Sequence, residues 1–147
     1  MVNNGLLEIP ILYLSKYIIE NKRAYYEGLR KVTEENKWTD WIMYMLDGIE
    51  TTALYTQQKI DSIIILMSET EKFLKEKAGD IYSKELLEII FRQPYSKRKF
   101  LEDEGLVKKK TAGTYLAKLE EIGLLNSITV GKEKLYINRR LFDILKK

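Results

Sequence analysis

The chain has 147 residues, of which 45% are hydrophobic and 32% charged, and its formal net charge is +3. This composition is typical of a soluble protein with a hydrophobic core, and the length suits one large domain or two small ones. The chain has no cysteine and no histidine. These absences exclude disulfides, thiolate metal sites, the usual zinc sites and histidine-based acid–base catalysis.

The sequence carries no signal for secretion or for a membrane. Its first ten residues lack a basic stretch followed by an apolar run, which a signal peptide would have. The longest apolar run, Ile63–Met67, is far too short to cross a bilayer. We therefore expect a cytoplasmic protein with no membrane partner, no metal and no bound cofactor.

Two short helices are predicted near the N-terminus. Gly5–Pro10 has the composition of a turn whose apolar residues need a partner. A helix over Ile11–Glu20 follows, with Leu14 and Ile18 facing inward. After a polar stretch, Ala24–Glu35 carries a second set of apolar residues at helical spacing.

The next predicted element is one long helix that Thr39 caps. Apolar residues recur mostly every three or four positions from Ile42 onward without a proline, so a helix of about 35–40 residues would extend about 55–60 Å. Its second half is apolar almost all round and must be covered. We therefore expect a homodimer that forms through this helix. The candidate contact residues are Ile60, Ile63, Ile64, Met67 and Leu74.

Ala78-Gly79-Asp80 is the clearest break in the pattern. We place a domain boundary there, which divides the chain into residues 1–78 and residues 79–147. The first part holds 10 basic and 12 acidic residues, a balance of −2, and the second holds 15 basic and 10 acidic residues, a balance of +5. Nucleic-acid binding requires such a basic excess, although many solvated surfaces carry as much.

The second part has the pattern of a winged helix-turn-helix. A helix over Ser83–Gln93 comes first. A second helix follows, which Ser96 caps and Gly105 ends, and a basic turn at residues 108–110 comes after it. Thr111 caps a third helix whose buried face holds Ala112, Leu116 and Leu119. The remaining predictions are the end of that helix at Ile122-Gly123, strands over Ser127–Val130 and Lys134–Ile137 around Gly131-Lys132, and a last helix over Arg139–Leu145.

This order predicts a mostly α fold (α+β). A helical segment with a long helix precedes a winged helix-turn-helix with a small β-hairpin. In that arrangement the second helix of the helix-turn-helix can enter the major groove of DNA. The fold alone does not establish DNA binding. The two tryptophans and the tyrosines lie at helical spacing and are expected in the core rather than on a stacking platform.

Basic and hydroxyl residues around the predicted turn and wing are the candidate DNA contacts. Lysines beside a helix N-terminus suit phosphate groups. The candidates are Lys108, Lys109, Lys110, Thr111, Thr114, Lys118, Lys132, Lys134, Arg139 and Arg140. The alternative is a solvated surface, since Gly113 and Ala117 on the outward helix face cannot bond a base. Lysines on an exposed hairpin also guard against aggregation. Any DNA binding is therefore expected to be weak and electrostatic.

The first part of the chain resembles a known family. The resemblance lies in Gly5-Leu-Leu-Glu-Ile-Pro-Ile-Leu-Tyr-Leu-Ser-Lys-Tyr-Ile-Ile-Glu-Asn-Lys-Arg-Ala-Tyr-Tyr26 and in the paired tryptophans of Lys37-Trp-Thr-Asp-Trp-Ile42. Both are similar to the segment that follows the catalytic motif of Fic-domain proteins. The resemblance covers roughly residues 5–75, and many Fic proteins carry a winged helix after this region.

The resemblance implies that the parent protein transfers AMP from ATP to a hydroxyl side chain. The family motif has the form His-Pro-Phe-x-x-Gly-Asn-Gly-Arg-x-Gly-Arg, and this chain has no histidine, so no catalytic residue carries over. We expect the chain to be the non-catalytic, regulatory or DNA-binding C-terminal region of such an adenylyltransferase, with the missing catalytic domain as a partner. The alternatives are a protein–protein docking module and a small free-standing transcription regulator that dimerises through the long helix.

Overall fold

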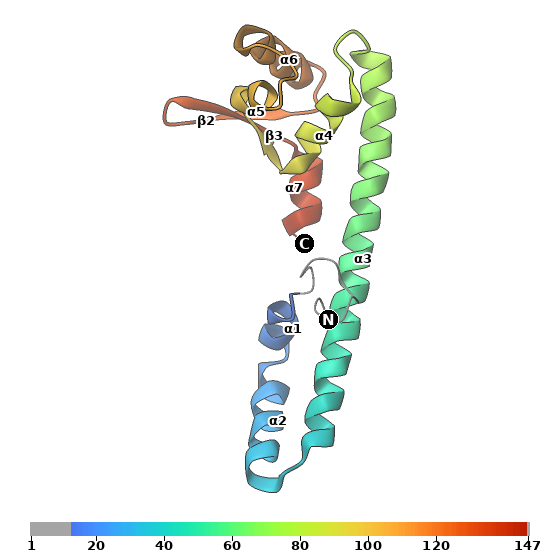
Figure 1. The fold of residues 1–147 in the computed structure, drawn as a ribbon, viewed down its shortest axis with the longest axis vertical. Helices are drawn as coiled ribbons and strands as arrows, with labels where there is room; N and C mark the ends of the chain where they lie inside the picture. Colours follow the sequence, from blue (N-terminus) through green and yellow to red (C-terminus); the bar gives the residue numbers. More distant parts are fainter. Residues whose placement is uncertain (1–12, 147) are drawn as a thin grey trace. The chain divides into compact units, whose positions relative to one another are not determined.

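A computed structural model of the protein describes residues 13–146 (Figure 1). The predicted turn at Gly5–Pro10 and the predicted first helical residue, Ile11, lie outside these residues. Contacts divide the chain into two compact units, Met1–Ile60 and Asp61–Lys147, called the N-terminal and C-terminal units below. The domain boundary expected after residue 78 stays a prediction. Within residues 13–146, no helix combines the length and the apolar character that a membrane span requires.

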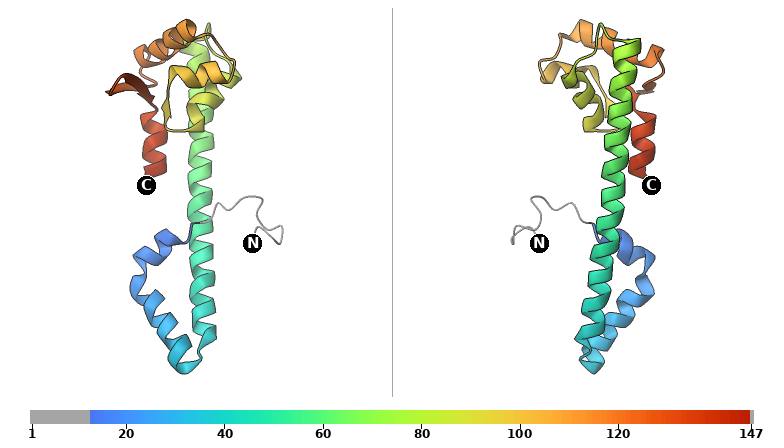
Figure 2. Two further views of the ribbon diagram at one scale, coloured as in Figure 1. Left: turned by 60° about the vertical axis from the view of Figure 1, so that its left-hand side comes forward. Right: turned by 90° about the vertical axis from the view of Figure 1, so that its right-hand side faces the viewer.

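Two short helices and the first turns of a long one make up the N-terminal unit. α1 (Ser15–Glu20) and α2 (Lys22–Glu35) are separated at Asn21, whose side-chain amide donates to the carbonyl of Tyr17 at 2.9 Å. α2 is followed by Asn36, which has a left-handed φ of +55°, a conformation that asparagine adopts more readily than most residues. The chain therefore turns back, and Figures 1 and 2 both show α2 beside the first turns of α3.

Aromatic rings fill the space between these helices. Tyr25 and Trp41 lie 5.2 Å apart between ring centroids, Trp41 stacks on Tyr44 at 5.7 Å, and Tyr17 contacts Tyr44 at 5.4 Å. These rings come from all three helices of the unit. Packing of aromatic rings at such distances stabilises an interface beyond the area it buries.

α3 (Trp38–Lys77) is a single helix of 40 residues, which confirms the predicted long helix. It begins one residue before Thr39, so this residue is not its cap. Trp38 is 54% exposed, and its indole N–H donates to the side chain of Asn36 at 2.8 Å. The expectation that both tryptophans lie in a core is therefore wrong for Trp38, which helps to form the turn before the helix.

The C-terminal unit contains the end of α3, and further helices and a β-hairpin follow it in the expected order. Its further elements are α4 (Lys84–Arg92), β1 (Tyr95–Ser96), α5 (Arg98–Asp103), α6 (Lys109–Glu121), β2 (Asn126–Val130), β3 (Glu133–Ile137) and α7 (Arg139–Lys146). The three strands form an antiparallel sheet in the order β1-β3-β2. The predicted mostly α fold with a small hairpin is confirmed.

The structure shows one cap that the sequence pattern did not predict, and it contradicts one that the pattern did predict. Ser83 caps α4, because its hydroxyl accepts from the N–H of Leu86 at 3.1 Å. Ser96 lies in β1 instead, opposite Tyr136 of β3, so it does not cap α5. A residue before proline favours an extended backbone. Gln93, which precedes Pro94, is extended in this way, and the chain leaves α4 as a short strand that the sequence pattern did not predict.

The turns of this unit depend on three glycines in the left-handed region. Gly105, Gly123 and Gly131 have φ values of +68°, +77° and +61°, which only glycine adopts without strain. They follow α5, follow α6 and form the hairpin turn, as predicted. α6 begins at Lys109, so Thr111 lies inside its first turn and the prediction that it caps the helix is wrong.

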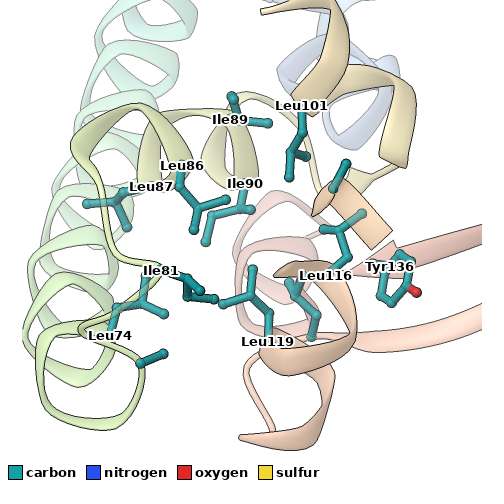
Figure 3. Close-up of a cluster of buried hydrophobic side chains, with 13 residues drawn as sticks. Leu74, Ile81, Leu86, Leu87, Ile89, Ile90, Leu101, Leu116, Leu119 and Tyr136 are labelled. Atoms are coloured by element: carbon teal, nitrogen blue, oxygen red, sulfur yellow. The ribbon is translucent and has the colours of Figure 1, made fainter. Parts of the chain in front are cut away.

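A single hydrophobic core holds the C-terminal unit together (Figure 3). It joins the end of α3 to α4, α5, α6 and the sheet. Its buried residues are Leu74, Ala78, Ile81, Leu86, Leu87, Ile89, Ile90, Leu101, Ala112, Leu116, Leu119, Leu125 and Tyr136. Leu74 is fully buried here, so the prediction that it forms a dimer contact is wrong. Its side chain packs inside the hydrophobic core of the C-terminal unit.

Truncating the core at α6 is expected to destabilise the C-terminal unit strongly. Leu116→Ala removes a fully buried side chain and should lower the free energy of unfolding by about 2–5 kcal/mol, because the reduced burial and the resulting cavity add. Urea denaturation followed by circular dichroism measures this. Val130→Ala, at a side chain 55% exposed, is the control and should change stability by less than about 1 kcal/mol. Equal losses of stability in the two variants would contradict the assigned core.

Candidate nucleic-acid interface

The position of α6 follows from its buried face. Ala112, Leu116 and Leu119 are fully buried, as predicted, so the opposite face points to solvent. Thr114 and Ala117 lie on this exposed face. The Thr114 hydroxyl donates to the carbonyl of Lys110 at 3.4 Å, which leaves little on the face to read a base.

α5 packs closely against one side of α6. A Cβ atom built on Gly113 would lie 3.1 Å from Nε of Arg98, so the absence of a side chain at Gly113 lets the Arg98 guanidinium lie against α6. This close approach places the cationic side chain of Arg98 beside the first turns of α6. The helical spacing of α6 predicts Gly113 on the outward face, where it cannot bond a base, and Arg98 was not among the predicted contacts.

The three turn lysines, Lys108, Lys109 and Lys110, lie where α6 begins. All three are exposed. Lys108 is the residue before the helix, and no acidic residue occupies the first turn. None of the ion pairs found among residues 13–146 includes a turn lysine. The positive end of the helix dipole therefore adds to three uncompensated charges.

A groove of about 470 Å³ lies between α5, the beginning of α6 and the hairpin turn. Its basic lining residues are Lys97, Arg98, Lys99, Lys109, Lys132 and Lys134, and its acidic ones are Glu102, Asp103 and Glu133. Lys97 and Glu133 form an ion pair across it. The structure thus brings Lys109 and Lys132 together with Arg98 and Lys99. The last two belong to a basic run at residues 97–99, which could have been found from the sequence.

Three of the predicted contact residues are neutralised by carboxylates. Lys118 binds both carboxylate oxygens of Asp80 at 2.6 and 2.7 Å. The hydrogen bond from its ammonium holds the pKa of Asp80 below its usual range. Arg140 forms an ion pair with Glu69. These two basic groups are tied to the turn after α3 and to α3 itself, so they are less available to a ligand than the turn lysines.

Lys134 is the third neutralised residue, and its partner is Glu120 of α6. Their side chains meet at 2.9 Å, and the Lys134 ammonium lies 5.0 Å from the centre of the Tyr136 ring. The hydroxyl of Ser127 also donates to Glu120. This hydroxyl and the Lys134 ammonium together lower the pKa of the Glu120 carboxyl. Glu120 therefore fastens both strands of the hairpin to α6.

The two remaining candidates, Thr111 and Arg139, are exposed but do not line the groove. Arg139 is the first residue of α7, which follows the sheet. The ten predicted contacts are therefore not one surface. Within the described residues, they divide into the turn lysines with Lys132, three side chains paired with carboxylates (Lys118, Lys134 and Arg140), and three residues in neither group (Thr111, Thr114 and Arg139).

One comparison with known protein families bears on this unit. A family model described as the C-terminal domain of protein adenylyltransferase SoFic-like matches residues 66–141. The match covers more than half of the chain. It extends from the end of α3, through the helices and the hairpin that carry the groove, into α7.

Lys118→Ala is expected to lower stability at neutral pH and to have less effect in acid. The ion pair between Lys118 and Asp80 lowers the pKa of the Asp80 carboxyl in the folded state. The stability that this pair contributes is therefore fully present above the pKa of an unfolded aspartate. It is lost as the pH falls through the lowered pKa of the folded state. Urea midpoints of wild type and variant should differ at about pH 7 and converge near about pH 2. Lys110→Ala is the control, and a Lys118→Ala difference that does not change with pH would contradict the assignment.

Proposed function

Because this chain belongs to the family of SoFic-like protein adenylyltransferases, we propose that it is the non-catalytic C-terminal portion of such a protein. In this proposal the C-terminal unit is a winged helix that contacts the phosphate backbone of duplex DNA. α5 and α6 form the helix-turn-helix, and β2 and β3 form the wing. The observation that carries the proposal is the grouping of uncompensated basic side chains around the groove.

The distribution of ion pairs supports a phosphate ligand. Among the residues that the structure describes, Arg98, Lys99, Lys109 and Lys132 line the groove and take part in none of the ion pairs found. Lys118, Lys134 and Arg140, in contrast, each have a carboxylate partner. Uncompensated cations beside a helix N-terminus suit phosphate oxygens, and release of counterions from the DNA then drives binding.

The outward face of α6 favours binding without sequence preference. Its exposed residues include Thr114, Ala117 and Glu121, and none of them offers the bidentate donor pair that reads guanine or adenine. Glu121 would also repel phosphate groups. We therefore assign the binding energy to the backbone contacts, which are common to all DNA sequences.

A second candidate function is docking on a protein, and the hairpin favours it. Ile128 and Val130 are 41% and 55% exposed and lie on the same face of β2, since they are two residues apart. Glu102 and Asp103 also line the groove and oppose an anionic ligand. An apolar hairpin face beside mixed charges fits a protein partner better than it fits DNA.

Replacing the turn lysines with alanine is expected to weaken DNA binding more than replacing the neutralised residues. The two variants, K108A/K109A/K110A and K118A/K134A/R140A, lose the same net charge. The first should also flatten the dependence of log affinity on log salt, by about 0.9 for each phosphate that is no longer neutralised. Fluorescence anisotropy with random and fixed duplexes measures both quantities.

The outcomes separate the two candidate functions. Equal weakening of binding to every duplex by the turn-lysine variant supports backbone contact. No binding to random duplex at low salt would exclude the DNA proposal and favour docking. A strong preference for one duplex that Thr114→Ala abolishes would show that α6 reads bases after all.

We also expect the chain to transfer no AMP by itself. It contains no histidine and therefore lacks the base that the family motif supplies. Incubation with labelled ATP and magnesium should label neither the chain nor an added protein, as judged by gel autoradiography against a blank without the chain. Labelling above that blank would contradict the non-catalytic assignment.

A further inference from the structure

One side of α3 in the C-terminal unit is exposed to solvent. Leu66, Thr70 and Leu74 face the interior and are buried. On another side, Asp61, Ile65, Ser68 and Lys72 are all exposed. We call these four residues the α3 stripe. α7 packs against a third side, which borders the stripe at Ile65. Ser62, Ile65, Leu66 and Glu69 line a groove there with Arg140, Asp143 and Ile144, and Figure 2 shows α7 beside α3.

The spacing within the stripe is that of a helix–helix seam. Its members are four, three and four residues apart, which is the repeat that keeps side chains facing a second helix over several turns. Ile65 is 60% exposed, and so is its neighbour Ile64. Two isoleucines that expose this much surface on adjacent positions of a helix favour burial against a partner.

The charges at the two ends of the stripe are opposite in sign. Asp61 lies at its beginning and Lys72 at its end. Neither takes part in the ion pairs found among the described residues, although Glu71 and Lys75 nearby form one at 2.6 Å. The stripe is therefore complementary to its own reversed copy. Such self-complementarity is the property that a two-fold interface between identical chains requires.

We propose that the α3 stripe is the contact surface for a second copy of this chain, packed antiparallel. The two-fold axis passes between the levels of Leu66 and Met67. In this register, Asp61 faces Lys72 of the second copy, Ile65 faces Ser68 of the second copy, and each contact occurs twice. Ile64 flanks the seam and contributes further apolar surface. A parallel pair in register would instead place Asp61 against Asp61 and Lys72 against Lys72, which like charges disfavour.

The residues of this proposed interface are not the ones that the sequence predicted. Leu74 lies in the core, and Ile63 and Met67 are half-buried. Ile65, which was not among the predicted contact residues, is more exposed than Ile60. The stripe belongs to α3, whereas the groove belongs to α5, α6 and the hairpin, so dimerisation does not depend on the proposed DNA binding.

Charge reversal at the two ends of the stripe tests this register. In Asp61→Lys both ends are basic, and in Lys72→Asp both are acidic, so each variant alone should dimerise about tenfold more weakly or worse. An equimolar mixture of the two variants should recover dimers, because each end then meets its opposite. The double variant D61K/K72D should also recover them. Sedimentation equilibrium and native mass spectrometry of the whole chain measure the dissociation constants and the composition of the dimers.

Asp47→Lys is the matched control, since it makes the same charge change at an exposed residue of α3 outside the stripe. It should leave the dissociation constant unchanged. A monomeric wild type at high concentration would overturn the proposal. So would a dimer that is indifferent to Asp61→Lys, or a mixture that forms no heterodimer while both variants remain folded by circular dichroism.

Discussion

The structure of the C-terminal unit depends on burial of the apolar face of α6. Leu116 and Leu119 are fully buried with Leu86 and Ile90 of α4 and with Leu74 at the end of α3. Because these residues occupy one face of each helix, burying them leaves little freedom in how the helices rotate. The turn lysines and the exposed face of α6 are consequences of that rotation. The core therefore determines which charged residues meet solvent.

Electrostatic pairing then divides the basic residues predicted as DNA contacts into two classes. Lys118, Lys134 and Arg140 form ion pairs with Asp80, Glu120 and Glu69. Those at the beginning of α6 find none among the described residues, because the first turn of that helix carries no acidic residue. Exposed ion pairs contribute little to stability. Their main effect here is that positive charge without an ion-pair partner remains at the turn lysines.

The groove and the α3 stripe lie on different elements of one unit. A DNA backbone at α5, α6 and the hairpin and a second copy at α3 would use separate residues, so the two interactions do not compete for a side chain. A dimer would carry two grooves. Two weak electrostatic contacts to one duplex would gain effective concentration from each other and bind more tightly together than singly.

The sequence by itself determined the order of the helices and of the hairpin, the long helix, the buried face of α6 and the hairpin turn at Gly131. Each of these depends on local periodicity or on a backbone conformation that favours glycine. The tertiary structure decided three other features. These are the pairing of Ser96 with Tyr136, the burial of Leu74, and the pairing of Asp80 with Lys118 rather than with Lys110. These features join residues about 40 positions apart or depend on neighbours that the fold supplies, and such contacts leave no period in the sequence.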